Sequence, residues 1–260
     1  MYYINYPTGE YDTVLDVLSH THTNSIKTSS IPLADFWHPN RNLEHKTIIS
    51  KMIKKDLSDA NYCFEYPTPA YQVGNSGKTL PYSKSSMTDL MILLPDTQIA
   101  IEAKYTEYVS DKSYKPLLKK WCNNQDHKKR IIDCWLRYIS SYVYEKQTSD
   151  ELLNGESLPY QFLHRTASVC FARNDAKPIL VYQLFYDKGN VDQLNGFEKL
   201  LRSSARTLKL NLDKLPFYLI KQEVANIKMK NSKENSSAFD KMKTEPVYVF
   251  NAMPTIIRVQ

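Results

Sequence analysis

The stretch that decides the fold is SMTDLMILLPDTQIAIEAKYTE, residues 86–107. Two runs rich in apolar and β-branched residues, 90–94 and 99–101, flank the triplet Pro-Asp-Thr at 95–97. Apolar runs of this length on either side of turn-forming residues are typical of paired strands. The stretch therefore predicts a β-hairpin whose two strands are buried.

Three charged side chains fall on this hairpin: Asp89 on its first strand, and Glu102 and Lys104 on its second. A two-residue loop, Pro95-Asp96, would place Asp89 opposite Glu102. Proline cannot adopt the positive φ that the favoured two-residue turns need, so we expect a four-residue loop with Asp89 opposite Lys104. Because side chains alternate between the faces of a strand, both loops bring the three to one face, at Cβ separations of roughly 5–8 Å.

Two carboxylates this close repel each other unless positive charge lies between them. Mg²⁺ meets that need with oxygen ligands and retained water. Lys104 could orient or deprotonate an attacking water, which indicates metal-assisted hydrolysis of a phosphodiester. The alternative is a surface ion pair that contributes little stability. The apolar runs around Asp89 and Glu102 favour the active site, because charged side chains are rarely buried in strands and those that are cluster at functional sites.

These residues resemble a known signature. Thr88-Asp89, followed after twelve residues by Ile101-Glu102-Ala103-Lys104, is similar to the active-site motif of the PD-(D/E)xK nuclease superfamily. The resemblance implies an α/β, restriction-endonuclease-like three-layer sandwich, with a mixed central sheet flanked by helices and an αβββαβ core. It implies that Asp89, Glu102 and the backbone carbonyl of Ala103 bind Mg²⁺, with Mn²⁺ as an alternative, and that Lys104 serves the water.

The resemblance has two departures. Thr88 stands where the motif has proline, and Gln125 is followed four residues later by Lys129 rather than by the tyrosine of some exonuclease-type members. The second departure speaks against an exonuclease and leaves Gln125 and His127 as auxiliary groups.

In many members a glutamate on the first core helix completes the site, and here the candidate is Glu44. A helical pattern begins near residue 40, and Glu44 precedes Ile48 and Met52 by four and eight residues. That spacing predicts that Glu44 points along the buried stripe toward the sheet. The alternative is an exposed glutamate that interacts with the helix dipole.

The sequence on both sides of the hairpin predicts a single domain, residues 1–260. Its core spans roughly 40–225, with residues 1–39 and 226–260 as elaborations. A bent or edge strand is predicted at 61–73, a long helix at 115–144, and a second helix at 192–210. Further strands are predicted at four places: 167–172, 179–186, 218–224 and 247–251.

The formal net charge is +6, which is compatible with a polyanionic partner such as DNA. Two groups of basic residues have the helical spacing that could follow phosphates: Lys128, Lys129 and Arg130, and Lys199, Arg202 and Arg206. The alternative for both groups is a solvated helix face.

Composition and sequence pattern speak against several classes of protein. Six glycines are few for a fold built on glycine-rich phosphate loops, and four cysteines without CxxC spacing favour free thiols over a zinc site. The longest apolar run, 90–94, is far shorter than the roughly 20 residues that a membrane helix needs. The N-terminus has no signal-peptide pattern, so we expect a cytoplasmic protein.

The sequence thus predicts a Mg²⁺-dependent endonuclease that acts on DNA in restriction or phage defence. A homodimer would let two such sites cut both strands. Two alternatives remain open: a catalytically silent, nuclease-like module that binds nucleic acid or a partner, and a nuclease that acts on RNA or branched DNA.

Overall fold

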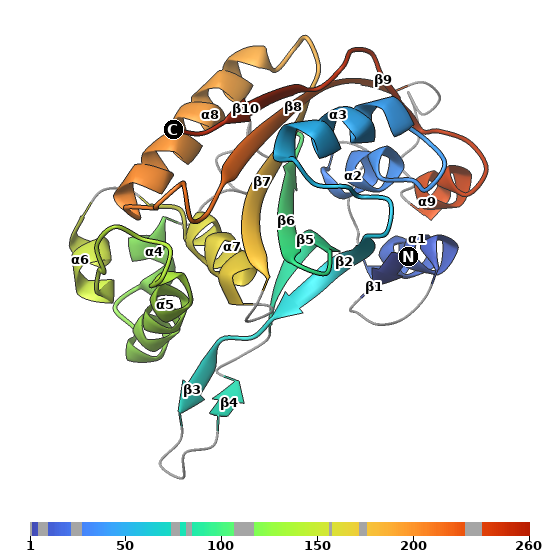
Figure 1. Cartoon of the computed structure of the whole chain (residues 1–260). Coiled ribbons are helices and arrows are strands. Elements are labelled where there is room, and N and C mark those ends of the chain that lie inside the picture. The colour runs from blue at the N-terminus through green and yellow to red at the C-terminus, as the bar shows by residue number, and fades with distance from the viewer. Residues whose placement is uncertain are drawn as a thin grey trace.

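The expected hairpin lies inside a mixed β-sheet in the computed structural model (Figure 1). The structure describes residues 2–4, 10–21, 28–73, 79–81, 85–106, 117–155, 158–171, 176–226 and 236–260. The strands are β1 (Tyr2–Ile4), β2 (Asn61–Thr68), β3 (Tyr71–Val73), β4 (Thr79–Pro81), β5 (Ser86–Leu93), β6 (Thr97–Lys104), β7 (Lys177–Tyr186), β8 (Phe217–Asn226), β9 (Tyr248–Phe250) and β10 (Thr255–Arg258). The helices are α1 (Tyr11–Thr21), α2 (Ser30–Phe36), α3 (Leu43–Ile53), α4 (Leu118–Cys122), α5 (Asp126–Ile139), α6 (Ser149–Asn154), α7 (Tyr160–Phe171), α8 (Val191–Thr207) and α9 (Ser236–Met242).

The main sheet has the order β1-β2-β5-β6-β7-β8-β10, and β9 pairs with another part of β8. Strands β2, β5 and β6 are antiparallel neighbours, whereas β6, β7 and β8 run parallel. Strands β3 and β4 form a separate hairpin that projects from the lower end of the molecule (Figure 1). The described chain is therefore an α/β structure with a mixed, open sheet.

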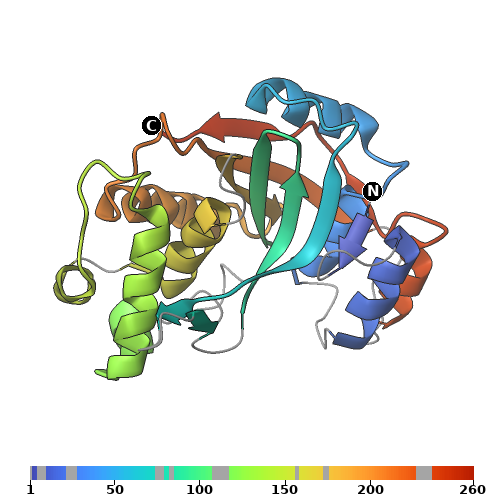
Figure 2. The same cartoon turned by 60° about the horizontal axis from the view of Figure 1, so that its bottom comes forward.

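Helices cover both faces of this sheet, and each side has its own apolar core (Figures 1 and 2). Leu90, Ile92 and Ile101 face α1, α2, α3 and α9. Met91 and Ala100, which have the opposite parity, face α4 to α8. Strands buried on both faces explain why the hairpin has two nearly continuous apolar runs. The result is three layers, helix–sheet–helix.

The loop of the hairpin differs from the expectation. Leu93 pairs with Gln98, and the Leu94 N–H donates to Thr97 O at 2.8 Å, so the loop is the two-residue Pro95-Asp96 and the predicted four-residue loop is wrong. Contacts from outside the hairpin hold this turn. Asp96 O accepts the Lys177 N–H at 2.8 Å, and the Asp96 carboxylate pairs with Lys55 at 2.8 Å. Tertiary contacts therefore override the local preference of the turn.

The long helix predicted at 115–144 is two helices, α4 and α5, over its described part. Asn123 and Asn124 separate them with φ of 47° and 55°. Asparagine tolerates this left-handed conformation better than most residues, so the pair ends one helix and redirects the chain into the next.

The strand predicted at 167–172 is also wrong, because residues 160–171 form α7. Every residue from Phe162 to Val169 is buried in this helix. A helix that is buried on all sides lacks the amphipathic period, so its sequence resembles that of a buried strand. The other three predicted strands correspond to β7, β8 and β9, and the helix at 192–210 corresponds to α8.

The segment 61–73 contains two strands, β2 and β3, and β2 lies inside the sheet rather than at its edge. The two terminal segments also join the core. Strand β1 pairs with β2, and α1, α2 and α9 pack on the face that α3 covers. Within the described ranges, no helix combines the length and apolarity needed to cross a bilayer.

Candidate functional site

The sheet splits where the three charged residues of the hairpin lie. The pairing of β5 with β6 ends at Leu90 and Ile101, which leaves Asp89 directly across from Glu102. Beyond this point β6 continues along β7 to Lys104, and β5 continues along β2. The Asp89 carboxylate accepts the Ala103 N–H at 2.8 Å, in place of a backbone partner. The prediction that these side chains share one face is therefore confirmed.

Glu102 is buried and has a partner at each carboxylate oxygen. Lys104 Nζ lies 2.7 Å from its Oε1, which also accepts the Gln161 side-chain amide. The Arg165 guanidinium binds Oε2. Glu102, Lys104 and Arg165 are 1%, 7% and 7% exposed, respectively. An ion pair this well buried is stable only because its polar atoms find partners in the site.

Arg165, from α7, lies between the two carboxylates. Its Nη2 is 3.7 Å from Asp89 Oδ1, and its Nη1 donates to Ser86 Oγ at 3.0 Å. Ser86 Oγ in turn lies 2.7 Å from His164 Nδ1. One guanidinium therefore joins Asp89, Glu102 and the first residue of β5.

The surroundings shift the two carboxylates in opposite directions. Burial, followed by the negative charge of Glu102, raises the pKa of Asp89 to about 7. Burial also acts against ionised Glu102, but Arg165 and Lys104 outweigh it and lower the pKa of that carboxyl. Burial, with the charges of Arg165 and Lys104, lowers the pKa of His164 well below its usual range. At neutral pH the site thus holds one firmly ionised carboxylate, one that is readily protonated, and an uncharged histidine.

Asp89 opens onto a cavity of about 410 Å³. Its lining combines polar side chains, among them Glu65, Ser86 and Arg165, with the aromatic rings of Trp135 and Tyr160. The Tyr160 ring stacks on Trp121 with centroids 3.7 Å apart. The cavity gives a ligand access to the Asp89 carboxylate, whose side chain is 22% exposed.

The donor types at this site fit a hard divalent cation. Mg²⁺ needs only one or two carboxylates beside water, and Asp89 and Glu102 supply them. The Oε1 atom of Gln161, buried beside Glu102, has no hydrogen-bond partner in the described residues, which leaves one more oxygen for a water or a cation. No cluster of three or more His, Cys, Asp or Glu residues in the described ranges is arranged to hold a metal. Positive charge between the carboxylates comes here from Arg165 and Lys104.

Glu44 does not join this site. It is exposed on α3, which packs on the opposite face of the sheet, so the prediction that it points toward the sheet is wrong. Met52, predicted to lie on the same buried stripe as Glu44, is 47% exposed, and the buried side of α3 is instead Lys46, Ile49 and Ile53. Ala103 lies at the split with its N–H bound to Asp89.

The residues of the two predicted basic groups differ in their partners and in their exposure. On α5, the Lys128 ammonium donates to Trp121 O at 2.8 Å, Lys129 pairs with Asp150, and Arg130 is exposed. The auxiliary candidates Gln125 and His127 are both exposed at the start of α5.

On α8, Lys199 and Arg206 are exposed, and Arg202 binds Glu198 at 2.9 Å. Contact of either group with DNA stays a prediction.

Sequence reasoning missed Gln161, Arg165 and Glu65. The first two stand four residues apart in a predominantly apolar segment. Because residues 160–171 form a helix, this spacing places both on one face of it, which a prediction of that helix would have indicated. Glu65 lies on β2, between residues that pair with Leu90 and Thr88, and its φ of 48° is unusual for a glutamate in a strand. Nothing in its sequence neighbourhood indicates that conformation.

Comparison with known proteins adds a family. The model of a family described as a domain of unknown function (DUF6946) matches residues 7–224, so the chain belongs to that family. No curated protein and no solved structure matches the chain. The match covers the hairpin, the split and α7, which together build the carboxylate site.

Proposed function

We propose that this member of the DUF6946 family is a nuclease that hydrolyses phosphodiester bonds in DNA with the help of Mg²⁺. One observation carries the proposal. Asp89, Glu102 and Lys104 meet on one face of the sheet, at the split between β5 and β6, beside an open cavity. Acid–acid–lysine sets of this kind serve metal-assisted hydrolysis.

The order of the elements supports a restriction-endonuclease-like core. Helix α3, strands β2, β5 and β6, the helices α4 to α7, and strand β7 occur along the chain in the order αβββαβ, with the separate β3–β4 pair inserted between β2 and β5. Strands β2, β5, β6 and β7 are also neighbours in the sheet. We propose this fold on the strength of that order and of the position of the motif within it.

The residues of the chain have separate tasks in the proposed reaction. Asp89 and Glu102 would hold a divalent cation, which supplies an activated water and neutralises charge at the phosphate. Lys104, with its ammonium 2.7 Å from Glu102, would orient the water or the phosphate oxygen next to it. Arg165 holds the carboxylates at short range when no cation lies between them, and its guanidinium is suited to a phosphate oxygen.

A second function is favoured by a specific observation. Both oxygens of Glu102 are bound by protein cations and an amide, and the positive charge of Arg165 already compensates the negative charge of the site. A site closed in this way would suit a module that binds nucleic acid without cleaving it.

The test is cleavage of supercoiled plasmid, structured RNA and branched DNA by the purified full chain in Mg²⁺, Mn²⁺ or EDTA. We expect metal-dependent cleavage of DNA that falls by about 100-fold or more in Asp89→Asn and Lys104→Ala. The matched control is Glu44→Gln, an exposed carboxylate on the opposite face, which should keep full activity.

Two results would overturn the proposal. Equal cleavage by the parent chain and Asp89→Asn would mean that the carboxylate site does not cut. Retained DNA binding with no cleavage of any substrate in either metal ion would identify the binding module. Preferential cleavage of RNA or branched DNA would keep the nuclease and change its substrate.

A further inference from the structure

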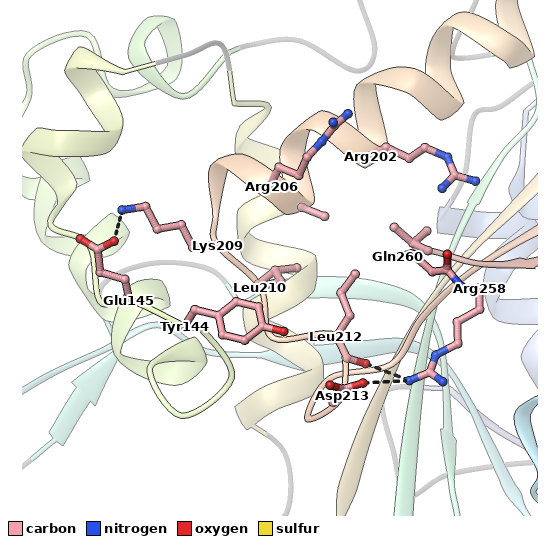
Figure 3. A pocket seen from close by; sticks show the side chains of 12 residues that line it. Tyr144, Glu145, Arg202, Arg206, Lys209, Leu210, Leu212, Asp213, Arg258 and Gln260 are labelled. Atoms are coloured by element: carbon pink, nitrogen blue, oxygen red, sulfur yellow. Dashed lines mark hydrogen bonds and ion pairs between the residues drawn. The ribbon is translucent and has the colours of Figure 1, made fainter.

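A second cavity, of about 670 Å³, lies at the C-terminal end of α8 (Figure 3). It is built by that helix end, the segment that follows it, residues 144–145, and the end of β10. None of its lining residues lines the cavity at Asp89. Its volume lies within the range of small-molecule sites.

Backbone hydrogen bonds hold the walls of this cavity in place. The Tyr144 N–H donates to Lys209 O at 2.9 Å, and the Asn211 N–H donates to Tyr142 O at 2.8 Å. Val143 and Leu210 form a β-bridge between the same two segments. The site is therefore formed before any ligand arrives, which lowers the entropic cost of binding.

The floor of the cavity is apolar, and an aromatic ring stands at its side. Ala205, Leu210 and Val259 are 3%, 4% and 2% exposed. Tyr144 is 71% exposed, the largest value among the exposed large hydrophobic side chains of the described chain. An accessible ring over an apolar floor is suited to stacking against a planar group.

The rim carries more positive than negative charge. Arg202, Arg206, Lys209 and Arg258 surround the cavity, against only Glu145 and Asp213 (Figure 3).

The two carboxylates are already paired: Glu145 binds Lys209, and Asp213 lies 3.7 Å from Arg258. In the described residues no ion pair or side-chain hydrogen bond forms at Arg206, whereas Arg202 binds Glu198. Among the described residues, Arg206 is therefore a guanidinium without a counter-charge at the mouth of an apolar cavity, and an anion would supply one.

We propose that this cavity binds a nucleoside phosphate, with the base against Tyr144 and the phosphate at Arg206. Such a ligand has a planar base that can stack against Tyr144 and a phosphate that can pair with Arg206. An apolar ligand alone would bury Arg206 without a counter-charge, and a free phosphate would leave the apolar floor and Tyr144 uncovered. The ligand could be a free nucleotide or a nucleotide of a nucleic acid strand, which share this chemistry. The proposal is independent of the nuclease activity.

The test is calorimetric titration of the full chain with ATP, AMP, adenosine and pyrophosphate, in EDTA so that no cation-dependent binding at Asp89 contributes. We expect saturable binding of ATP and AMP, and weaker binding of adenosine and of pyrophosphate. Arg206→Glu should weaken nucleotide binding by about 10-fold or more, and Tyr144→Ala by several-fold. Both side chains are exposed, so both variants should fold, which a thermal melt verifies.

The matched control is Lys188→Glu, the same charge reversal at an exposed lysine outside the cavity. It should change nucleotide affinity less than two-fold. Equal losses in Lys188→Glu and Arg206→Glu would reveal diffuse attraction of anions and overturn the proposal, as would the absence of ATP binding at millimolar concentration.

A further arm identifies the source of the nucleotide. A 5′-phosphorylated ten-residue oligothymidylate is titrated under the same conditions. Tighter binding than that of AMP, lost in Arg206→Glu, would assign the cavity to a nucleic acid strand. Weaker binding would assign it to free nucleotides.

Discussion

The ionisation of Asp89 links the stability of the protein to the chemistry of its site. Burial and the charge of Glu102 raise the pKa of Asp89 to about 7, from the 3.8 of a free aspartate. The folded chain therefore holds this proton more tightly than the unfolded chain. Stability from this group is complete at low pH and is lost as pH rises from about 4 to about 7. Ionised Asp89 thus weakens the fold unless a cation compensates it.

Asp89→Asn should consequently stabilise the chain in metal-free buffer. Asparagine keeps an oxygen for the Ala103 N–H and removes the buried charge. We expect the gain over the parent chain to grow by about 2 kcal/mol between pH 5 and pH 8, measured by urea unfolding in EDTA. Excess Mg²⁺ should raise the melting temperature of the parent chain but not of the variant. A variant that is less stable at pH 8, or a pH-independent difference, would show that Asp89 is not destabilising.

Which residues meet at the site was only partly visible in the sequence. Twelve residues separate Asp89 from Glu102, and one separates Glu102 from Lys104, so any hairpin loop of even length places the three on one face. This follows from the sequence because the alternation of side chains is a local property of strands. Arg165 and Gln161 come from a helix about sixty residues later, so no local pattern connects them to Glu102.

At the scale of elements, helices and turns ended where particular residues adopt a left-handed backbone. Helix α3 is terminated by Lys54, with φ 57°, and the Lys55 N–H closes the helix end on Ser50 O at 3.0 Å. Glycine is the residue that usually occupies this position, since it adopts positive φ without strain. With few glycines in the chain, such positions fall to Asn, Lys and Glu, which hid several element boundaries from sequence reasoning.

Replacing Lys54 with glycine should therefore stabilise the protein. The change relieves the left-handed strain, about 1 kcal/mol, and part of that gain is offset by the flexibility of glycine in the unfolded chain. We expect a net gain of about 0.5 kcal/mol in urea unfolding. Lys51→Gly, an exposed position inside the same helix, is the control and should cost about 1 kcal/mol. Destabilisation by Lys54→Gly would mean that the lysine side chain makes a contact that outweighs the strain.

At the scale of the whole molecule, the buried Asp35 joins the N-terminal helices to the C-terminal segment. Its Oδ2 accepts the N–H groups of Val247 and Tyr248 at 2.8 and 2.7 Å, and its Oδ1 binds Arg41 at 3.0 Å. Burial raises the pKa of Asp35, although these donors oppose the rise. The carboxylate thus connects residues more than two hundred positions apart.

Asp35→Ala should destabilise the fold by about 3 kcal/mol or more, because two buried backbone N–H groups and Arg41 lose their partner. Chemical denaturation measures the loss, and amide hydrogen exchange at Val247 and Tyr248 should accelerate. Asp240→Ala removes an exposed carboxylate of α9 and should change stability by less than about 0.5 kcal/mol. Equal effects of the two substitutions would show that the Asp35 contacts are not coupled to global unfolding.

The sequence by itself determined the hairpin, most of the strands, the α/β class and the shared face of Asp89, Glu102 and Lys104. All of these follow from short-range periodicity and from the alternation of side chains along a strand. Only the tertiary structure decided the two-residue turn, the exclusion of Glu44 and the arrival of Arg165 between the carboxylates. These depend on which helix packs on which face of the sheet, and that choice is made by contacts between segments far apart in the chain.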